Sequence, residues 1–341
     1  MKTKVAINGF GRIGRNILRA LIESERTDIE VVAVNDLASV EMQAHLLQFD
    51  SVHGRLNQPV SVEGNSLKIG DQAIRCSSIR NPEELEWDDV DIALECTGLF
   101  TTKESAIRHL DNGSSRVLVS APAKNADKTI VYGVNHQQIE QSDLVVSNAS
   151  CTTNCLAPMA MVLHQQVGIE KGYMTTIHSY TGDQPTLDTN HSDPYRARAA
   201  AMSMIPTSTG AARAVGLVLP ELDGKLDGSA IRVPTPNVSV VDLSFVASRK
   251  TNTDEINQLF SEASKDQLEG ILDLSTDPLV SIDFNHIPFS SIVAANETKV
   301  QDDNFVRVLG WYDNEWGFSN RMLDTAAYLD NIAKGNSAIA A

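Results

Sequence analysis

The first half of the chain alternates short apolar runs with amphipathic stretches. Residues 4–8 form an apolar run, and residues 16–22 carry apolar positions at the spacing of a helix that packs on one face. A second apolar run, residues 30–34, ends at Asn35 and Asp36. Similar short runs follow at residues 91–96, 116–120 and 144–147. Because short buried strands separated by helices build parallel sheets, this pattern predicts a Rossmann-like, doubly wound parallel sheet domain over residues 1–150.

The pattern changes after residue 150. Residues 181–206 are polar with little periodicity, and long alternating runs follow them. Alternation of apolar and polar positions is typical of an antiparallel sheet with one covered face. We therefore expect an α+β domain over residues 151–315 with a mostly antiparallel sheet. A last helix, at about residues 316–334, is expected to pack back on the first domain. The strands expected in the second domain lie in residues 231–246, 279–284 and 306–312.

Length and composition agree with two domains. The chain has 341 residues, and a domain typically takes roughly 100–200. The formal charge of −16 opposes general attraction to nucleic acid or an anionic membrane, so we expect neither as a partner. No run approaches the roughly 20 apolar residues of a membrane span. The start reads as a strand rather than a signal peptide, which predicts a cytoplasmic protein whose four cysteines are free thiols.

Residues 9–14, GFGRIG, match the glycine pattern of dinucleotide-binding turns. The motif follows a predicted strand and opens a predicted helix. In such turns Gly9 permits the tight turn, Gly11 lets the backbone approach a pyrophosphate, and Gly14 allows close helix packing. The free N–H groups of the helix start bind phosphate. The alternative is a glycine-rich turn without a ligand.

Asp36 lies 22 residues beyond Gly14, close to the place of the acidic residue that binds an adenosine ribose. A carboxylate accepts hydrogen bonds from a ribose 2′-hydroxyl and repels a 2′-phosphate. Asp36 therefore favours NAD over NADP as the cofactor. The alternative interpretation of Asp36 is a solvated acid at the end of a strand.

Two cysteines, Cys151 and Cys155, stand four residues apart in SNASCTTNCLAP, residues 147–158. They fit no zinc pattern, so no metal site is expected, and a spacing of four in a helix gives poor disulfide geometry. The small polar residues around Cys151 are typical of a helix start, where the helix dipole favours a thiolate. Cys155, one turn further on, is expected to be buried and inert. On placement alone, Cys151 could also be a structural cysteine at a helix start.

Among eight histidines, His178 has the setting of a partner for a reactive thiol. It ends the strand-like run at residues 173–177 and precedes a polar loop, where catalytic groups are common. From the spacing alone, a structural histidine remains an alternative.

Several motifs resemble those of the phosphorylating glyceraldehyde-3-phosphate dehydrogenase family. The resemblance covers residues 3 to about 330 and marks residues 151–315 as a catalytic domain. The motifs occur in the family's order: INGFGRIGRN (7–16), SNASCTTNCLAP (147–158), HSYTGDQ (178–184), IPTSTGAA (205–212), RVPTPNVSVVDL (232–243) and WYDNEWGFSN (311–320).

The resemblance implies an NAD-dependent oxidation of glyceraldehyde 3-phosphate, with inorganic phosphate, to 1,3-bisphosphoglycerate. Cys151 would attack the aldehyde to give a hemithioacetal and then a thioester, and His178 would be the base. Thr181 and Arg232 would flank the phosphate of the substrate. The residues implied for the attacking phosphate are Ser150, Thr152, Arg196, Thr209 and Gly210. The further cofactor contacts implied are Arg12, Ile13, Arg80, Ser120 and Asn314.

Two positions depart from the pattern of the family. Phe318 stands where many relatives have a tyrosine, and Thr189-Asn190 replaces a Leu-Pro or Gly-Pro pair. In the family the second position belongs to a loop that contacts a neighbouring subunit, and the resemblance implies a homotetramer. Two other functions stay open from the sequence: an erythrose-4-phosphate dehydrogenase, and a thiol redox sensor that binds NAD.

Overall fold

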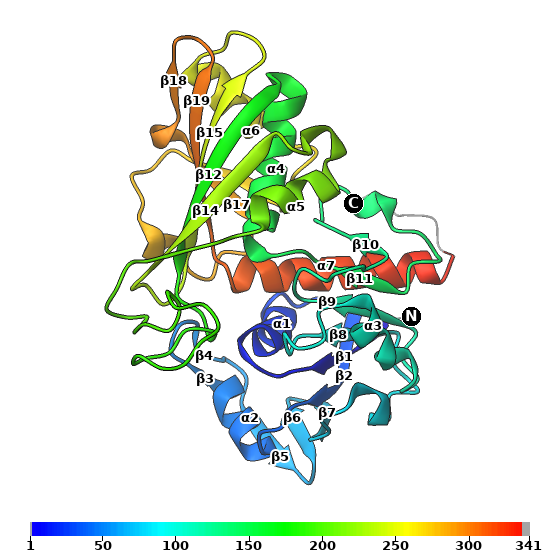
Figure 1. The fold of residues 1–341 in the computed structure, drawn as a ribbon. Helices are drawn as coiled ribbons and strands as arrows, with labels where there is room; N and C mark the ends of the chain where they lie inside the picture. Colours follow the sequence, from blue (N-terminus) through cyan, green and yellow to red (C-terminus); the bar gives the residue numbers. More distant parts are fainter. Residues whose placement is uncertain (1, 336–341) are drawn as a thin grey trace. The chain divides into compact units, whose positions relative to one another are not determined.

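The computed structural model describes residues 2–335, which form two compact units. Of these residues, the first unit contains 2–132, 136–149 and 319–335, and the second contains 133–135 and 150–318. Figure 1 shows the elements of both units. Each unit combines helices with a sheet, so the predicted α/β fold class is confirmed. Within residues 2–335, no helix has the length and hydropathy needed to cross a membrane.

The described part of the first unit contains a nine-stranded sheet in the order β10-β11-β9-β8-β1-β2-β7-β6-β5. All neighbours from β10 to β7 are parallel, as the sequence predicts. Antiparallel β6 and β5 extend one edge, which the sequence analysis did not predict. The strands are β1 (Thr3–Asn8), β2 (Ile29–Asn35), β5 (Val60–Glu63), β6 (Ser66–Ile69), β7 (Gln72–Ser77), β8 (Ile92–Glu95), β9 (Arg116–Val119), β10 (Lys128–Thr129) and β11 (Val145–Ser147).

Helix α1 (Arg12–Glu23) follows β1 directly, and its inward face includes Ile17 and Leu18, neither of which is exposed. Full burial of such side chains contributes about 1.5–3 kcal/mol each, which holds the helix against the sheet. A small hairpin of β3 (Phe49–Asp50) and β4 (Gly54–Arg55) follows the next helix. The other helical elements are α2 (Val40–Gln48), η1 (Pro82–Glu84), α3 (Lys103–Ala106), η2 (Ile107–Leu110), η3 (His136–Gln138) and, from Ser319 onward, α7 (Trp316–Ala333).

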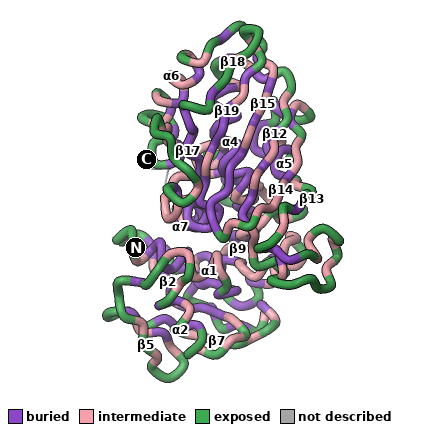
Figure 2. The backbone as a smooth tube through the Cα atoms, turned by 90° about the vertical axis from the view of Figure 1, so that its left-hand side faces the viewer, coloured by how far each residue is buried: buried purple, intermediate pink, exposed green. Residues whose placement is uncertain are grey.

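The described part of the second unit is built on an eight-stranded sheet in the order β13-β14-β12-β15-β19-β17-β16, with β18 paired to β19. Most neighbours are antiparallel, and two pairs, β12 with β14 and β16 with β17, are parallel. The centre of the sheet is buried (Figure 2). The strands are β12 (Ile169–Ser179), β13 (Ile205–Thr207), β14 (Leu226–Val233), β15 (Ser239–Ala247), β16 (Leu272–Ser275), β17 (Ser291–Ala294), β18 (Lys299–Gln301) and β19 (Phe305–Tyr312).

Three helices, α4 (Cys151–Gln166), α5 (Ala211–Val218) and α6 (Thr253–Ala263), pack side by side against this sheet (Figure 1). The remaining short helices are η4 (Pro220–Leu222), η5 (Ser281–Phe284) and η6 (Ala295–Glu297).

The run at residues 231–246 is divided between β14 and β15 rather than forming one strand. Pro234 and Pro236 lie at the break, where they cannot donate to a ladder, and Val238 takes a positive φ of 67°.

The predicted strand at residues 279–284 is wrong. This segment ends in the short helix η5, and the Asp283 carboxylate accepts the backbone N–H of Val280, which closes a turn. Val280 and Ile282 are exposed, whereas Phe284 packs with Val238 and Ile292. The apolar alternation therefore came from a turn that buries one residue, not from a strand with a covered face.

Candidate active site

The glycine turn after β1 opens a pocket of about 430 Å³ at the carboxyl ends of β1, β2 and β8. Gly9 has a φ of 90°, and a Cβ there would lie 2.6 Å from the backbone nitrogen of Thr97. A Cβ on Gly14 would lie 2.2 Å from the carbonyl oxygen of Gly9, whereas Gly11 faces open space. Only glycine fits at positions 9 and 14. The open space at Gly11 leaves the backbone of the helix start accessible to a ligand.

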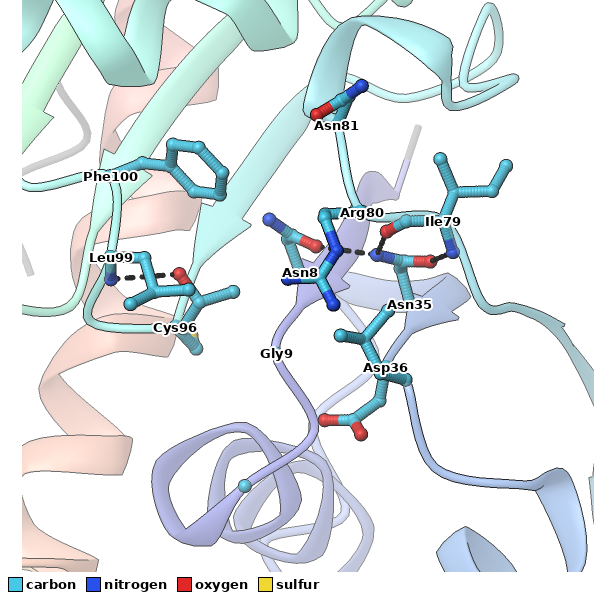
Figure 3. A pocket seen from close by; sticks show the side chains of 13 residues that line it. Asn8, Gly9, Asn35, Asp36, Ile79, Arg80, Asn81, Cys96, Leu99 and Phe100 are labelled. Carbon is cyan, nitrogen blue, oxygen red and sulfur yellow. Dashed lines mark hydrogen bonds between the residues drawn. The ribbon is translucent and has the colours of Figure 1, made fainter.

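Asp36 and Arg80 line the same pocket (Figure 3). One carboxylate oxygen of Asp36 accepts the Phe10 N–H at 2.8 Å, and the other accepts the Ala38 N–H at 3.0 Å. A carboxylate oxygen accepts more than one hydrogen bond, so Asp36 keeps acceptor capacity for ribose hydroxyls. With the open helix start at Gly11, these residues fit a dinucleotide whose ribose carries no 2′-phosphate.

The other predicted cofactor contacts are placed differently. Arg12 and Ile13 start α1 but do not line the pocket, and the Arg12 guanidinium forms an ion pair with buried Asp50. Ser120 also lies outside the lining and donates a hydrogen bond toward the Cys96 thiol, which does line the pocket. The remaining pocket-lining residues were not predicted from the sequence: Asn8, Asn35, Leu37, Ile79, Asn81, Cys96, Thr97, Leu99 and Phe100.

Cys151 is the first residue of α4, as the sequence predicts. Ser150 is the N-cap, and its hydroxyl accepts the Thr153 N–H at 3.1 Å. The Cys151 Sγ lies 3.5 Å from the Nε2 of His178 on β12. Cys155 is fully buried and contacts Ser291 and Gly310, and burial raises the pKa of its thiol to about 12. All four cysteines, each within the described residues, are free thiols.

The His178 ring has a defined tautomer. Its Nδ1 lies 2.7 Å from the Ser179 carbonyl oxygen, a contact that is attractive only if Nδ1 carries the proton. Arg232 Nη1 lies 3.1 Å from the same nitrogen, but it also donates to the Ser179 carbonyl oxygen at 2.9 Å and to the Thr181 hydroxyl. We therefore assign the Nδ1 proton to the bond with Ser179, which leaves the Nε2 lone pair facing the Cys151 sulfur.

The electrostatics correct the expectation of a thiolate. Burial raises the pKa of the Cys151 thiol, although the charge of Arg232 and hydrogen bonds to Thr152 lower it. Burial and the charge of Arg232 depress the pKa of His178 to about 3. Desolvation of the pair therefore opposes the field of the helix start and favours the neutral thiol and the neutral imidazole.

Arg232 and Thr181, predicted around a substrate phosphate, lie together. Arg232 is the register partner of His178 across β14 and β12. Its Nη1 is 3.4 Å from the Thr181 hydroxyl, and its Nε has no hydrogen-bond partner among the described residues. A guanidinium with a spare donor next to a hydroxyl suits a phosphate.

The residues predicted for the second phosphate already have partners. Thr152 contacts the hydroxyl of Tyr312 at 2.9 Å, and Thr209 accepts the N–H of Ala211 beside Gly210, the N-cap of α5. Arg196 donates to Asp183 and Thr207, and its charge also lowers the pKa values of His178 and Arg232.

Tyr312 was not identified from the sequence. Its buried hydroxyl contacts both Thr152 and Thr176 at 2.9 Å, and its ring meets His178 edge-on at 6.0 Å. The alternation along β19 indicates that Tyr312 is buried, but not which groups its hydroxyl contacts.

Asn314 is held by two serine hydroxyls. Its Oδ1 accepts from Ser179 at 2.9 Å and from Ser239 at 2.8 Å. Ser239 in turn accepts the backbone N–H of Ser179, and of its two possible acceptors Asn314 Oδ1 at 2.8 Å is closer than the Ser179 hydroxyl at 3.4 Å. Both of these bonds use Oδ1, so neither engages the Asn314 Nδ2 group.

Within residues 2–335 no three His, Cys, Asp or Glu side chains are grouped so that they could hold a metal ion. A Rossmann-type pocket in one unit and a thiol–imidazole pair in the other are the equipment of a dinucleotide-dependent aldehyde oxidoreductase.

The chain belongs to the glyceraldehyde-3-phosphate dehydrogenase family. Residues 3–103 match the family model "Glyceraldehyde 3-phosphate dehydrogenase, NAD binding domain", and residues 150–314 match its "C-terminal domain". A glyceraldehyde-3-phosphate dehydrogenase of Xanthobacter flavus is 65% identical over 334 residues, 97% of this chain and 100% of the relative. Relatives with the same name occur in Cereibacter sphaeroides, 64% identical (97% of this chain, 100% of the relative), and in Geobacillus stearothermophilus, 55% identical (96% and 98%).

Proposed function

We propose that the protein oxidises glyceraldehyde 3-phosphate with NAD and inorganic phosphate and forms 1,3-bisphosphoglycerate. The observation that carries the proposal is the 3.5 Å contact between the Cys151 Sγ and an imidazole nitrogen with a free lone pair, beside the Arg232 guanidinium. The thiol and base serve covalent catalysis on an aldehyde, and the guanidinium serves a phosphate. The family membership of the chain supports the same substrate.

The reaction starts with attack of the Cys151 sulfur on the aldehyde carbon. The S–H proton passes to His178 Nε2 and then to the new oxyanion, which gives a neutral hemithioacetal. The neutral imidazole, which burial favours by lowering the pKa of His178 to about 3, is the form that can accept this proton. Attack therefore does not require a preformed thiolate.

In the oxidation step, His178 Nε2 accepts the hydroxyl proton as a hydride leaves the same carbon. NAD supplies the hydride acceptor when it is bound. Gly9, Gly11, Asp36 and Arg80 are the proposed residues of its pocket, and Asn314 is proposed to donate from Nδ2 to its carboxamide. The product on Cys151 is a thioester.

Phosphate then attacks the thioester carbonyl, and the C–S bond breaks. The His178 proton returns to the sulfur, and the phosphate proton is released to solvent. We assign the substrate phosphate to Thr181 and Arg232. The attacking phosphate is assigned to Ser150, Thr152, Arg196, Thr209 and Gly210.

We also propose a cytoplasmic homotetramer. The free thiols suit a reducing compartment, and several large apolar side chains of the loop at residues 183–204 are exposed. These are Leu187, Tyr195, Met202 and Met204.

The function is tested by measuring NADH formation with glyceraldehyde 3-phosphate or erythrose 4-phosphate, each with and without inorganic phosphate. We expect glyceraldehyde 3-phosphate to be the better substrate and turnover to depend on phosphate. A preference for erythrose 4-phosphate without phosphate dependence would overturn the proposal. Cys151→Ser is expected to abolish turnover while NAD binding persists, and Cys155→Ser is the matched control that keeps most activity.

A further inference from the structure

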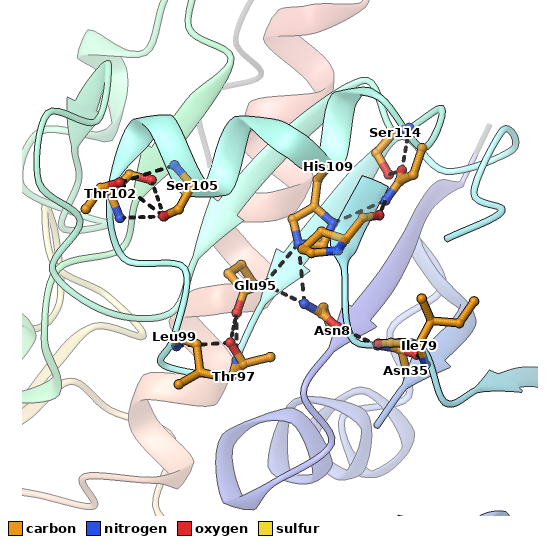
Figure 4. A network of polar contacts seen from close by, with 12 residues as sticks. Asn8, Asn35, Ile79, Glu95, Thr97, Leu99, Thr102, Ser105, His109 and Ser114 are labelled. Atoms are coloured by element: carbon orange, nitrogen blue, oxygen red, sulfur yellow. Dashed lines mark hydrogen bonds and ion pairs between the residues drawn. The ribbon is translucent and has the colours of Figure 1, made fainter. Parts of the chain in front are cut away.

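A buried polar network (Figure 4) adjoins the dinucleotide pocket, because Asn8, Asn35 and Thr97 belong to both. At its centre is the Glu95 carboxylate at the end of β8, where the residue is 1% exposed. One oxygen accepts the N–H and the hydroxyl of Thr97. The other accepts Asn8 Nδ2 at 2.7 Å and the His109 Nε2 proton at 2.9 Å. Four donors around one carboxylate require the ionised, acceptor-only form.

The direction of the His109 contact is set by backbone groups. Asn112 Oδ1 accepts the Ser114 N–H at 3.1 Å, and Asn112 Nδ2 donates to the Pro82 carbonyl at 2.9 Å, so this amide has one orientation. The same Nδ2 lies 3.2 Å from His109 Nδ1, which must therefore be the accepting nitrogen. The proton is on Nε2 and points at Glu95. Trp87 stacks on the imidazole at 5.6 Å and fixes the ring plane.

A second branch runs from Glu95 to one wall of the pocket. Asn8, which donates to Glu95, accepts Asn35 Nδ2 at 2.8 Å. Asn35 also donates to the Ile79 carbonyl at 2.8 Å and accepts the Ile79 N–H at 2.9 Å. These bonds hold the segment that carries Arg80 against the end of β2 (Figure 3).

A third branch runs to the opposite wall. The Thr97 hydroxyl donates to Glu95 and accepts the Leu99 N–H at 3.0 Å. Its proton and one lone pair are thus used inside the protein. Both pocket walls, the segment after β7 and the segment after β8, are therefore tied to one carboxylate through bonds whose direction is set by backbone groups.

We propose that Glu95 and His109 are positioning residues for the dinucleotide pocket: the neutral His109 orients the Glu95 carboxylate, and Glu95 sets the spacing of the two pocket walls that hold the adenosine half. The proposal rests on the proposed use of this pocket by NAD. Burial of a carboxylate without a cationic partner lowers the stability of the fold, because the charge loses its hydration. Two apolar side chains in place of Glu95 and His109 would fill the same space with a smaller desolvation penalty. Three of the four donors to this carboxylate explain its presence, because Asn8 Nδ2, the Thr97 N–H and the Thr97 hydroxyl belong to residues that line the pocket.

The test measures dissociation constants for NAD and for ADP-ribose, which lacks the nicotinamide, by calorimetry with purified full-length protein. Glu95→Gln places an NH₂ group against donors in either amide orientation. Backbone bonds fix the amides of Asn112 and Asn35, and Asn35 in turn fixes that of Asn8. Because these donors cannot reverse, we expect both constants to rise by roughly tenfold. At saturating NAD, the kcat for glyceraldehyde 3-phosphate should stay within about twofold, because the reacting groups are untouched.

His109→Gln and His109→Leu test the orienting role. A glutamine can present an Nε2 donor to Glu95 and should retain most of the affinity for ADP-ribose, whereas leucine should lose it as Glu95→Gln does. Thr97→Ser and Thr97→Ala form a second pair at a partly exposed site, which keeps the test decisive if a buried variant does not fold. The serine variant should bind normally, and the alanine variant should bind more weakly.

Thr3→Val is the matched control. Thr3 lies at the other end of β1 from Asn8, and its buried hydroxyl donates to Asp330 at 2.6 Å. This variant should lose stability but bind both ligands as the wild type does. If the wild type binds NAD and the folded Thr97→Ala and Glu95→Gln variants bind ADP-ribose unchanged, the positioning role is wrong. If the wild type itself binds neither ligand, it is the proposed function that fails.

Discussion

Ser179 shows how one backbone unit directs two side chains of the candidate site. Its carbonyl oxygen fixes the proton of His178 on Nδ1 and leaves Nε2 for the Cys151 sulfur. Its N–H binds the Ser239 hydroxyl, which in turn points its proton at Asn314. A base and an amide donor thus both take their direction from the backbone of one residue, without a charged residue between them.

Ser239→Ala is expected to weaken NAD binding by roughly three- to tenfold and to leave ADP-ribose binding unchanged. The change removes one of the two donors that hold Asn314 Oδ1, so the Nδ2 group proposed to face the nicotinamide is less well oriented. Calorimetric titration with both ligands measures the effect. Ser244→Ala, in the same strand and half-buried, is the control. Equal weakening toward ADP-ribose would contradict the assignment of Asn314 to the nicotinamide side.

Arg232→Gln is expected to slow alkylation of Cys151 by iodoacetamide at pH 7 by roughly tenfold. Arg232 lowers the pKa of the Cys151 thiol, so removal of its charge raises that pKa and reduces the thiolate fraction. The rate is followed by mass spectrometry of the peptide that contains Cys151. Arg198→Gln, which breaks only an exposed ion pair with Asp188, is the control. An unchanged rate would mean that Arg232 does not influence the thiol.

At the scale of elements, α1 is tied to the β3–β4 hairpin by two arginines. Arg12 pairs with Asp50, whose side chain is only 2% exposed and whose other oxygen accepts the N–H groups of Val52 and His53. Fully buried Arg19 donates to the carbonyl oxygens of Leu47 and Gly54. The helix that opens at the glycine turn is therefore anchored to the end of α2 and to the hairpin, which helps to keep its N-terminus in place.

Asp50→Asn is expected to lower the free energy of unfolding by about 2 kcal/mol at pH 7. The Arg12 bond and the two N–H contacts hold the pKa of Asp50 at about 2, below the ordinary 3.8, despite its burial. A depressed folded-state pKa contributes stability above pH 4, and this contribution is lost as the pH falls through 2.

Urea unfolding of wild type and variant at pH 7 and at pH 3 measures this dependence. The difference between the two proteins should be about half as large at pH 3. Asp71→Asn, at an exposed turn, is the control and should show no such trend. A difference that grows toward low pH would contradict the assignment of the stabilisation to the ionised Asp50.

At the scale of the whole molecule, the polar loop at residues 183–204 is unusual in exposing large apolar side chains. Met202 and Met204 are 78% and 75% exposed. Exposed apolar side chains that gather on one segment indicate a surface that another protein chain covers. Under the proposed homotetramer, that chain is a second copy of the same protein.

Joint replacement of Met202 and Met204 by glutamine is expected to shift the assembly toward smaller species, because the apolar area buried between subunits decreases. Sedimentation equilibrium of wild type and variant measures the mass, which should be four times that of one chain for the wild type. Leu217→Gln, an exposed position on α5, is the control. A wild-type monomer would refute the homotetramer, and an unaffected tetramer would place its interface elsewhere.

Much of the architecture could be predicted because it depends on local pattern. The short apolar runs and the glycine turn specify parallel strands and the start of α1, and the small polar residues around Cys151 specify the start of α4. The failure at residues 279–284 has the same origin. Apolar alternation does not tell a strand from a turn that buries one residue, and there the Asp283 contact with the backbone decided for the turn.

The sequence by itself determined the elements, the glycine positions and the residue types of the candidate site, since these follow from backbone geometry and side-chain chemistry. Only the tertiary structure decided their protonation and orientation. Folding desolvates the Cys151 thiol beside His178, which raises the pKa of the thiol. Glu95 accepts bonds from residues that lie 2, 14 and 87 positions away in the chain. Burial and hydrogen-bond direction arise only when such distant segments meet, so no local pattern encodes them.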